Sequence, residues 1–281
     1  MPTSAQNDNF WAKTWDDIGT SRGGWVGGFH YPHGMELFDR EATFGDDYLY
    51  FYEGFLGDER NQADVDRAVE VLGLTPGDRI LDAPCGHGRL ANLLAERGMS
   101  VTGVDASPEF IKLGREDAME RGVEVDYRIG DLRDLGVDGP FDAVVCWFTS
   151  FGYFDDDGNQ EVLDEFARVL RPRGKLGIET IHHDGFVRRF TPAPFASTTF
   201  QGEDVMIDTS IFEPVTGRIH TERVVYRDGS VRKSQHQVRL PTVPEFEQWL
   251  TAAGFVDVEC LGSDRSPPTI DDLRLIVVAT R

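Results

Sequence analysis

A glycine-rich turn between a short apolar segment and an amphipathic one constrains this chain more than any other feature. The turn reads Ile80-Leu81-Asp82-Ala83-Pro84-Cys85-Gly86-His87-Gly88-Arg89. Gly86 and Gly88 let the backbone bend sharply and leave no Cβ between the chain and a ligand, and the helix expected over 89–97 offers free amide hydrogens. The segment therefore predicts a strand, a turn and a helix, with a ligand held at the turn.

Strand and helix patterns alternate on both sides of this turn. We expect strands over 79–83, 100–104, 123–129, 141–147 and 175–181, and helices over 64–72, 89–97, 108–121 and 159–170. Repeated β-α-β units of this kind predict a parallel sheet with helices on both faces. Ligands bind such sheets at the carboxyl ends of the strands.

The alternation breaks after residue 190. Three β-rich stretches over 205–212, 218–226 and 231–239 are separated by Pro214-Val215-Thr216-Gly217 and Asp228-Gly229. Those are turn sequences, so we expect an antiparallel insertion. A helix over 243–253 and strands over 256–261 and 274–279 then complete the α/β pattern.

Four segments follow from this pattern. We expect an aromatic N-terminal lid or arm over 1–57, a cofactor-binding core over 58–189 and its C-terminal completion over 241–281. The antiparallel insertion over 190–240 is expected to form a substrate lid or a dimer contact. A homodimer is therefore one expected assembly.

The charge of the chain limits its partners. There are 49 acidic and 28 basic side chains, for a net charge of -21. Such a field repels phosphate backbones and anionic lipid, so we expect neither a nucleic acid nor a membrane as partner. No apolar run approaches the length of a membrane span and the N-terminus lacks a signal pattern, so a cytoplasmic protein is expected. Three cysteines without a close pair indicate no disulfide framework, and no metal site is expected.

Two acidic residues follow the next strands. Asp105 ends the strand over 100–104, where a carboxylate can accept hydrogen bonds from both hydroxyls of a ribose. Asp131 ends the third strand, placed to accept from an adenine amino group, and an ordinary turn acid is the alternative.

The same glycines, with Ala91, also match the dinucleotide fingerprint, so a nicotinamide enzyme is the rival. In a dinucleotide loop the first glycine stands at the end of the strand and the helix faces pyrophosphate. Here residues 82–85 separate the strand from Gly86. A ligand with adenosine but no phosphates is therefore favoured.

In these residues the chain resembles the class I S-adenosylmethionine-dependent methyltransferases, over about residues 56–281. The motifs that carry the resemblance are residues 82–88, Asp105, Gly130-Asp131, Phe141-Asp142-Ala143-Val144-Val145 and Arg168-Val169-Leu170-Arg171-Pro172-Arg173-Gly174. The family usually has a second glycine at the position of Arg173. The resemblance implies a doubly wound, Rossmann-like sheet of seven mostly parallel strands, the last one antiparallel, with the β insertion typical of small-molecule methyltransferases.

The resemblance also implies S-adenosylmethionine as cofactor and a small metabolite or natural product as methyl acceptor. Backbone groups of Ala83 and Gly86 would hold the methionine end, and Trp147 would lie beside it. The residues expected to bind the cofactor are Asp82, Ala83, Gly86, Gly88, Asp105, Ala106, Asp131, Leu132 and Trp147.

Methyl transfer from a sulfonium is an in-line displacement, for which the protein mainly aligns the reactants and excludes water. A general base is needed only when the acceptor must lose a proton early, as a hydroxyl must. We expect Tyr153 near the acceptor, and His182 or His183 as a base at the end of the fifth strand. In an extended chain the two histidines point to opposite sides, so only one would face the acceptor.

The sequence is compatible with three functions. The first is methyl transfer to a nitrogen or oxygen of a small acceptor. The second is an NAD-dependent oxidoreductase, and the third is a member of the methyltransferase fold that keeps the cofactor without transferring its methyl group.

Overall fold

The computed structural model describes residues 43–52, 56–190 and 195–281. Most of the expected N-terminal arm, including Trp11, Trp15 and Trp25, lies outside these residues. The interpretation of that arm as a lid therefore stays a prediction.

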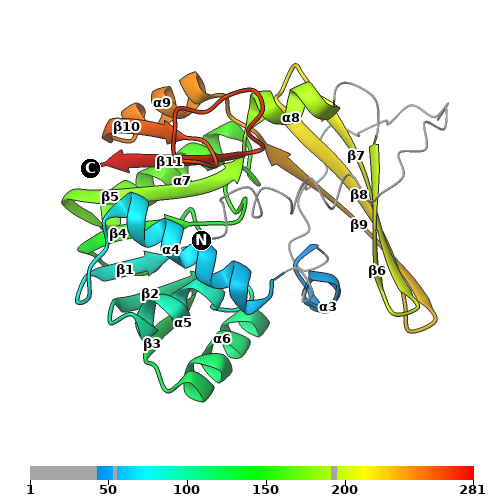
Figure 1. The fold of residues 1–281 in the computed structure, drawn as a ribbon, viewed down its shortest axis with the longest axis horizontal. Helices are drawn as coiled ribbons and strands as arrows, with labels where there is room; N and C mark the ends of the chain where they lie inside the picture. The colour runs from blue at the N-terminus through cyan, green and yellow to red at the C-terminus, as the bar shows by residue number, and fades with distance from the viewer. Residues whose placement is uncertain (1–42, 53–55, 191–194) are drawn as a thin grey trace.

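A seven-stranded sheet forms the centre of the molecule, in the order β10-β11-β5-β4-β1-β2-β3 (Figure 1). Strand β11 runs antiparallel to β5 and β10, and the other pairs are parallel. This confirms the fold predicted from the sequence. The strands are β1 (Arg79–Asp82), β2 (Ser100–Asp105), β3 (Val125–Ile129), β4 (Phe141–Cys146), β5 (Leu170–Ile181), β10 (Val256–Leu261) and β11 (Arg274–Thr280).

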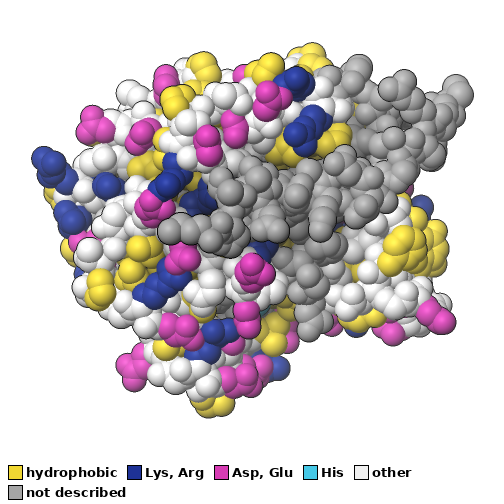
Figure 2. Space-filling model, in the orientation of Figure 1, with side chains coloured by type: hydrophobic (Ala, Val, Ile, Leu, Met, Phe, Trp, Pro, Cys, Tyr) yellow, Lys and Arg dark blue, Asp and Glu magenta, His cyan; other side chains and the backbone are white. Residues whose placement is uncertain are grey.

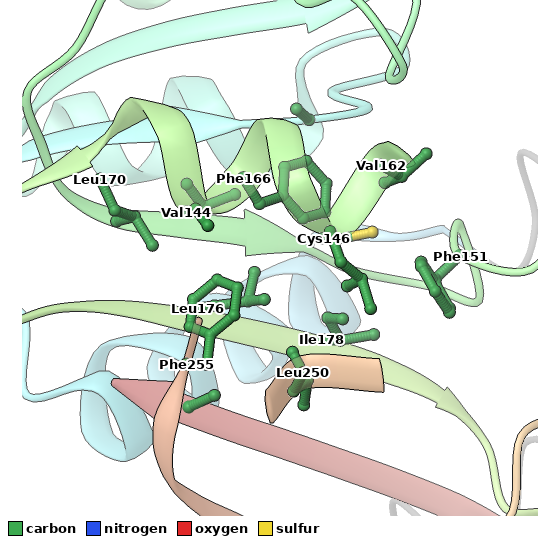
Figure 3. Packing of buried hydrophobic residues seen from close by; sticks show 14 of the residues in the cluster. Val144, Cys146, Phe151, Val162, Phe166, Leu170, Leu176, Ile178, Leu250 and Phe255 are labelled. Atoms are coloured by element: carbon green, nitrogen blue, oxygen red, sulfur yellow. The ribbon is translucent and has the colours of Figure 1, made fainter. Parts of the chain in front are cut away.

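Helices cover both faces of this sheet because its strands bury apolar side chains on both sides. On β4, Val144 packs in the cluster that contains Phe166, whereas Val145 packs in the cluster that contains Val65. Figure 3 shows part of the first cluster. The helices of the core are α4 (Asp58–Leu72), α5 (Arg89–Glu96), α6 (Pro108–Arg121), α7 (Asp156–Val169) and α9 (Val243–Ala252).

The ends of α6 show how local sequence sets these bounds. The Ser107 side chain accepts a hydrogen bond from the Phe110 amide at 3.3 Å, and Pro108 occupies the first turn. Gly122 ends the helix in the left-handed region with φ 69°. The helix therefore has the bounds predicted from the sequence.

The order of the strands reverses at β1, which lies between β2 and β4. In open α/β sheets the crevice at such a reversal, outside the carboxyl ends of the strands, is where ligands bind. The glycine turn at 83–88 follows β1 directly. It therefore lies at the binding edge of the sheet.

Beyond this edge lies a second, antiparallel sheet in the order β6-β7-β8-β9, beside the short helix α3 (Asp46–Tyr52) (Figure 1). It contains the three expected strands, β7 (Asp204–Glu213), β8 (Arg218–Arg227) and β9 (Ser230–Arg239). Strand β6 (Phe195–Gln201) was not expected, because its polar residues give no alternating apolar pattern. We call this unit the insertion sheet.

The insertion sheet carries exposed apolar side chains at one end. Phe200, Tyr226 and Val231 lie in one cross-strand row with Val205, and these three are 68%, 47% and 57% exposed. Figure 2 shows hydrophobic side chains gathered at this end, whereas acidic and basic side chains are interspersed over much of the remaining visible face. The expected dimer contact has a defined surface here, and it stays a prediction.

Candidate functional site

A cavity of about 880 Å³ opens at the carboxyl ends of β1, β2 and β4. Its described lining extends from the glycine turn to β9 of the insertion sheet. Seven of the nine residues expected to bind the cofactor line it: Asp82, Gly86, Asp105, Ala106, Asp131, Leu132 and Trp147. Residues predicted from four separate strand ends, those of β1, β2, β3 and β4, therefore meet in one space.

Gly86 presents bare backbone to this cavity. Its φ is +55°, and a Cβ built on it would meet nothing within 4 Å. The Gly86 amide donates a hydrogen bond to Asp105 Oδ2 at 2.9 Å, which joins the turn to the end of β2. A ligand can therefore lie directly against the turn, beside a carboxylate.

Gly88, also expected to bind the cofactor, lies outside the described lining of the cavity. A Cβ at this position would lie 2.0 Å from the Tyr127 hydroxyl oxygen and 3.1 Å from Gly114 Cα. Gly88 thus allows α5 to pack against its neighbours, and it does not line the cavity. Ala83 does not line it either, because it is fully buried and its amide donates to the Val145 carbonyl at 2.9 Å.

Asp105 keeps acceptor capacity for a ligand. Its Oδ1 accepts from the Ser107 amide at 2.8 Å, and Oδ2 accepts from Gly86. A carboxylate has about four lone-pair positions, so it can accept hydroxyl donors in addition to these two backbone bonds. This geometry fits the predicted contact with a ribose.

Asp131 is more constrained. Its Oδ1 accepts from the Arg133 amide at 2.9 Å, and the Arg133 guanidinium lies 3.0 Å from each carboxylate oxygen. The same guanidinium lies 4.3 Å from the ring centre of Phe154. The carboxylate, the cation and the ring together form one wall of the cavity.

Two buried polar atoms beside the turn have no hydrogen-bond partner among the described residues, Asp82 Oδ2 and Trp147 Nε1. Both side chains line the cavity, and they are 2% and 3% exposed. Burial raises the pKa of Asp82 to about 7. An acceptor and a donor without partners are expected where a polar ligand completes the structure.

The two histidines expected as bases lie outside the described lining of this cavity. His182 is 4% exposed, with Nδ1 3.1 Å from the Asp272 carbonyl oxygen. His183 begins the helix α8 (His183–Phe190), and its Nδ1 lies 2.7 Å from Asp184 Oδ1. The chain turns into a helix here, so the assumption of an extended histidine pair was wrong.

Tyr153 does line the cavity, together with Phe44 and Tyr48 from the C-terminal end of the expected aromatic arm. Its ring centre lies 5.4 Å from that of Phe44, and Tyr48 of α3 also lines the cavity, stacked on Tyr52 at 4.5 Å. Burial raises the pKa of Tyr153 above its ordinary value of 10. Its hydroxyl therefore stays protonated near neutral pH and can donate a hydrogen bond, but it cannot serve as a base.

Arg89, the first residue of α5, also lines the cavity and was not predicted as a site residue. Its Nη1 donates to Asp64 Oδ2 at 2.9 Å and to Asn61 Oδ1 at 3.2 Å, and its guanidinium lies 4.9 Å from the ring centre of Phe148. The cation is therefore held by α4. Its position directly after the glycine turn was the available sequence signal.

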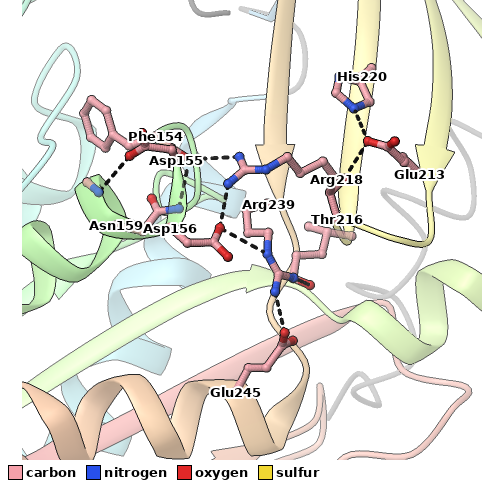
Figure 4. A network of polar contacts seen from close by, with 12 residues as sticks. Phe154, Asp155, Asp156, Asn159, Glu213, Thr216, Arg218, His220, Arg239 and Glu245 are labelled. Atoms are coloured by element: carbon pink, nitrogen blue, oxygen red, sulfur yellow. Dashed lines mark hydrogen bonds and ion pairs between the residues drawn. The ribbon is translucent and has the colours of Figure 1, made fainter. Parts of the chain in front are cut away.

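The insertion sheet is joined to the core beside the cavity (Figure 4). Arg218 Nη1 donates to the Phe154 carbonyl at 2.9 Å, and its Nη2 lies 2.6 Å from Asp156 Oδ1. Arg239 bonds Glu245 of α9, and its Nε lies 3.5 Å from Asp156 Oδ1. These ion pairs hold the inner ends of β8 and β9 against the loop that lines the cavity.

The sequence relationships agree with this geometry. Residues 80–174 match the family model described as a methyltransferase domain. The chain is 39% identical over 108 residues to the "Ubiquinone biosynthesis O-methyltransferase" of Xylella fastidiosa (strain 9a5c), a stretch that covers 38% of this chain and 43% of that protein. Residues 80–174 form a methyltransferase domain. The cofactor of this family, S-adenosylmethionine, is the one expected from the sequence.

The chain spans less than half the length of these curated relatives, 43% and 47% for the Xylella and Xanthomonas axonopodis proteins. Solved structures match more of the chain at lower identity. An S-adenosylmethionine-dependent methyltransferase from Clostridium acetobutylicum is 16% identical with a TM-score of 0.70, covering 83% of this chain and 97% of that one. The sugar N-methyltransferase KedS8 from Streptoalloteichus is 20% identical with a TM-score of 0.62, covering 92% and 99%. At these identities the likeness shows the fold.

Two further features concern only the part of the chain that the structure describes. No helix within it is both long and apolar enough to cross a membrane. Within the same residues no group of three or more His, Cys, Asp or Glu side chains is placed to hold a metal ion.

Proposed function

We propose that this protein transfers the methyl group of S-adenosylmethionine to a nitrogen or oxygen of a small metabolite or natural product, in the cytoplasm. The relatives support a small acceptor, because those of similar fold include proteins named as a sugar N-methyltransferase and an amino pentose methyltransferase.

The charge of the cavity carries this proposal against the NAD-dependent alternative. Asp82 and Asp105 both lie at the glycine turn, and Asp105 Oδ2 is 2.9 Å from the amide of Gly86. An acid after the second strand also binds the ribose in dinucleotide sites, so Asp105 fits either cofactor. The distinction rests on Asp82, which ends β1 ahead of the glycines and, in its charged form above about pH 7, would repel a pyrophosphate and attract a cation. S-adenosylmethionine has a sulfonium and an ammonium group, whereas NAD carries a pyrophosphate.

Different residues of this chain would hold the ribose, the adenine and the methionine end of the cofactor. Asp105 would bind the ribose hydroxyls, and Asp131 with Leu132 would bind the adenine. The backbone of Gly86 and the unpartnered atoms of Asp82 and Trp147 would hold the methionine end. When bound, the cofactor supplies an activated methyl group.

Alignment and exclusion of water are the remaining tasks of the protein. Phe44, Tyr48 and Tyr153 form an aromatic wall that would enclose the acceptor. Neither His182 nor His183 lines the cavity, and Tyr153 stays protonated. His87 also lines the cavity, but burial lowers its pKa to about 4, so it is a weak base. A neutral amine can attack through its lone pair without a base, so this arrangement favours a nitrogen acceptor.

The test is methyl transfer from S-[methyl-³H]adenosylmethionine to a panel of amino sugars, alkylamines and catechols, together with binding of S-adenosylhomocysteine and of NAD⁺. We expect binding of S-adenosylhomocysteine, no binding of NAD⁺, and labelling of amines above catechols. Saturable NAD⁺ binding without S-adenosylhomocysteine binding would refute the proposal. Cofactor binding without labelled product across the panel would instead favour the non-methylating member of the fold.

A further inference from the structure

We propose that Gln237 of the insertion sheet binds the methyl acceptor through a hydroxyl or amino group, and that the cavity selects an acceptor whose bound part is uncharged or cationic. This inference rests on the proposed methyl transfer. It adds a specificity-determining residue to the acceptor side of the site.

Gln237 has an unusual combination of burial and lack of partners. It lies on β9, the strand of the insertion sheet that meets the core, and it lines the cavity. The residue is 4% exposed, yet its Oε1 is buried with no hydrogen-bond partner among the described residues. A buried polar group without a partner destabilises a protein, so such groups in native structures call for an explanation.

The polar neighbours of Gln237 are engaged with other groups. His220, opposite it on β8, has Nε2 3.2 Å from Glu213 Oε2, and its buried Nδ1 forms no hydrogen bond with Gln237. Arg239, two residues along β9, bonds Glu245 and the Leu240 carbonyl. These contacts fix β9 in place without involving the amide of Gln237, which leaves that amide for a ligand.

The position of Gln237 indicates that this ligand is the methyl acceptor rather than the cofactor. The candidate cofactor residues all come from the core, between Asp82 and Trp147, whereas Gln237 comes from the insertion sheet. Tyr153 and Asp155, which follow the end of β4, line the same cavity. A molecule that contacts Gln237 therefore lies at the acceptor end.

The charges that line the cavity limit the chemistry of the acceptor. Its described cations are Arg89, paired with Asp64 at 2.9 Å, and Arg133, paired with Asp131 at 3.0 Å. Asp64 is shared by Arg89, Arg60 and Arg274, so Arg89 is only partly neutralised. The described lining nevertheless contains four acids, Asp82, Asp105, Asp131 and Asp155, against these two arginines. A phosphate or carboxylate on the acceptor would therefore meet more acids than arginines in this lining.

A glutamine amide suits the remaining classes of acceptor. It offers donors on Nε2 and an acceptor on Oε1, and a 180° rotation exchanges the two ends. A hydroxyl or an amine can satisfy either end. A site built around such a group rejects analogues that lack it, because the amide is then left unpaired.

The first arm of the test separates a ligand role from a structural one. We compare Gln237→Leu with Gln235→Leu, which changes an exposed glutamine on the same face of β9. With S-adenosylhomocysteine bound and no acceptor present, Gln237→Leu should raise the Tm by about 2 °C or more, because it removes an unsatisfied buried group. Gln235→Leu should leave the Tm unchanged. A fall in the Tm of Gln237→Leu would assign the amide to the fold and overturn the inference.

The second arm measures methyl transfer to matched pairs of compounds, glucosamine against glucosamine 6-phosphate and catechol against 3,4-dihydroxybenzoate. In each pair the member without the added anion should be methylated faster. Gln237→Leu should lower kcat/KM for that member by about tenfold, with the KM for S-adenosylmethionine unchanged and Gln235→Leu equal to wild type. A preference for the anionic member, or an unchanged kcat/KM in Gln237→Leu, would overturn the inference.

The two proposals fail in different ways. If the wild-type protein does not bind S-adenosylhomocysteine, the proposed function fails. If it methylates acceptors but Gln237→Leu does so equally well, only the role of Gln237 fails. If neither pair is methylated, the Tm of Gln237→Leu decides the inference alone.

Discussion

Replacement of Asp105 by asparagine tests the predicted ribose contact, because it exchanges one carboxylate oxygen for an NH₂ group. The two carboxylate oxygens of Asp105 each accept one backbone hydrogen bond, from Gly86 at 2.9 Å and from Ser107 at 2.8 Å. Asparagine has a single oxygen, so one of these amides would face an NH₂ group. We expect the free energy of unfolding to fall by about 1–3 kcal/mol, the usual cost of leaving a buried donor unpaired.

Asp105→Asn should also weaken cofactor binding, because the ribose hydroxyls lose their charged acceptor. A hydrogen bond from a ribose hydroxyl to a charged carboxylate contributes about 1.5–3 kcal/mol, which corresponds to a loss of affinity between about tenfold and about 150-fold. Calorimetric titration with S-adenosylhomocysteine measures this directly and involves no turnover. Asp126→Asn is the matched control, because Asp126 is exposed on β3, pairs with Arg128 and does not line the cavity. Affinity within about threefold of wild type in Asp105→Asn, or an equal loss in Asp126→Asn, would refute the ribose contact.

Three further changes have defined outcomes. Burial raises the pKa of Asp82 to about 7, so between about pH 4 and 7 the folded state binds this proton more tightly than the unfolded state does. The free energy of unfolding should therefore fall as pH rises through this range. Urea unfolding at a series of pH values should show a smaller change with pH in Asp82→Asn than in wild type. Gly88→Ala should destabilise the protein by about 2–5 kcal/mol in urea unfolding, since its φ is +84° and the new Cβ meets the Tyr127 hydroxyl, and a Tyr127→Phe background should reduce that cost. The pH-rate profile of methyl transfer should be unchanged in His182→Gln and in His183→Gln, and a lost inflection near neutral pH in either would return that histidine to the mechanism.

The core of the fold follows from short-range patterns. Helix α6, with Ser107 before it and Gly122 after it, carries both of its end signals within the sequence. The cofactor residues were predictable for a related reason, because the carboxyl ends of neighbouring parallel strands meet at one edge of a sheet. Once the strands β2 and β3 are predicted, Asp105 and Asp131 are placed at this edge because they follow the ends of those strands.

The acceptor side depends on tertiary structure. The sequence predicted that residues 1–57 and 190–240 could cover the site, but no periodicity in either segment singles out Tyr48 on α3 or Gln237 on β9 as a lining residue. Gly86 and Gly88 show a similar limit, since both have positive φ although only Gly86 lines the cavity. For His183 a signal was present, because Phe186 and Phe190 stand four residues apart, which is helical rather than strand spacing.

A crystal structure of the protein with S-adenosylhomocysteine tests the central claim most directly. We expect the ribose hydroxyls to lie within hydrogen-bond distance of Asp105, and the amino acid end to lie against Gly86 and Asp82. The sulfur should face the part of the cavity that is lined by Tyr153 and Gln237. A ligand bound elsewhere, or bound here with its sulfur turned away from Tyr153, would contradict it.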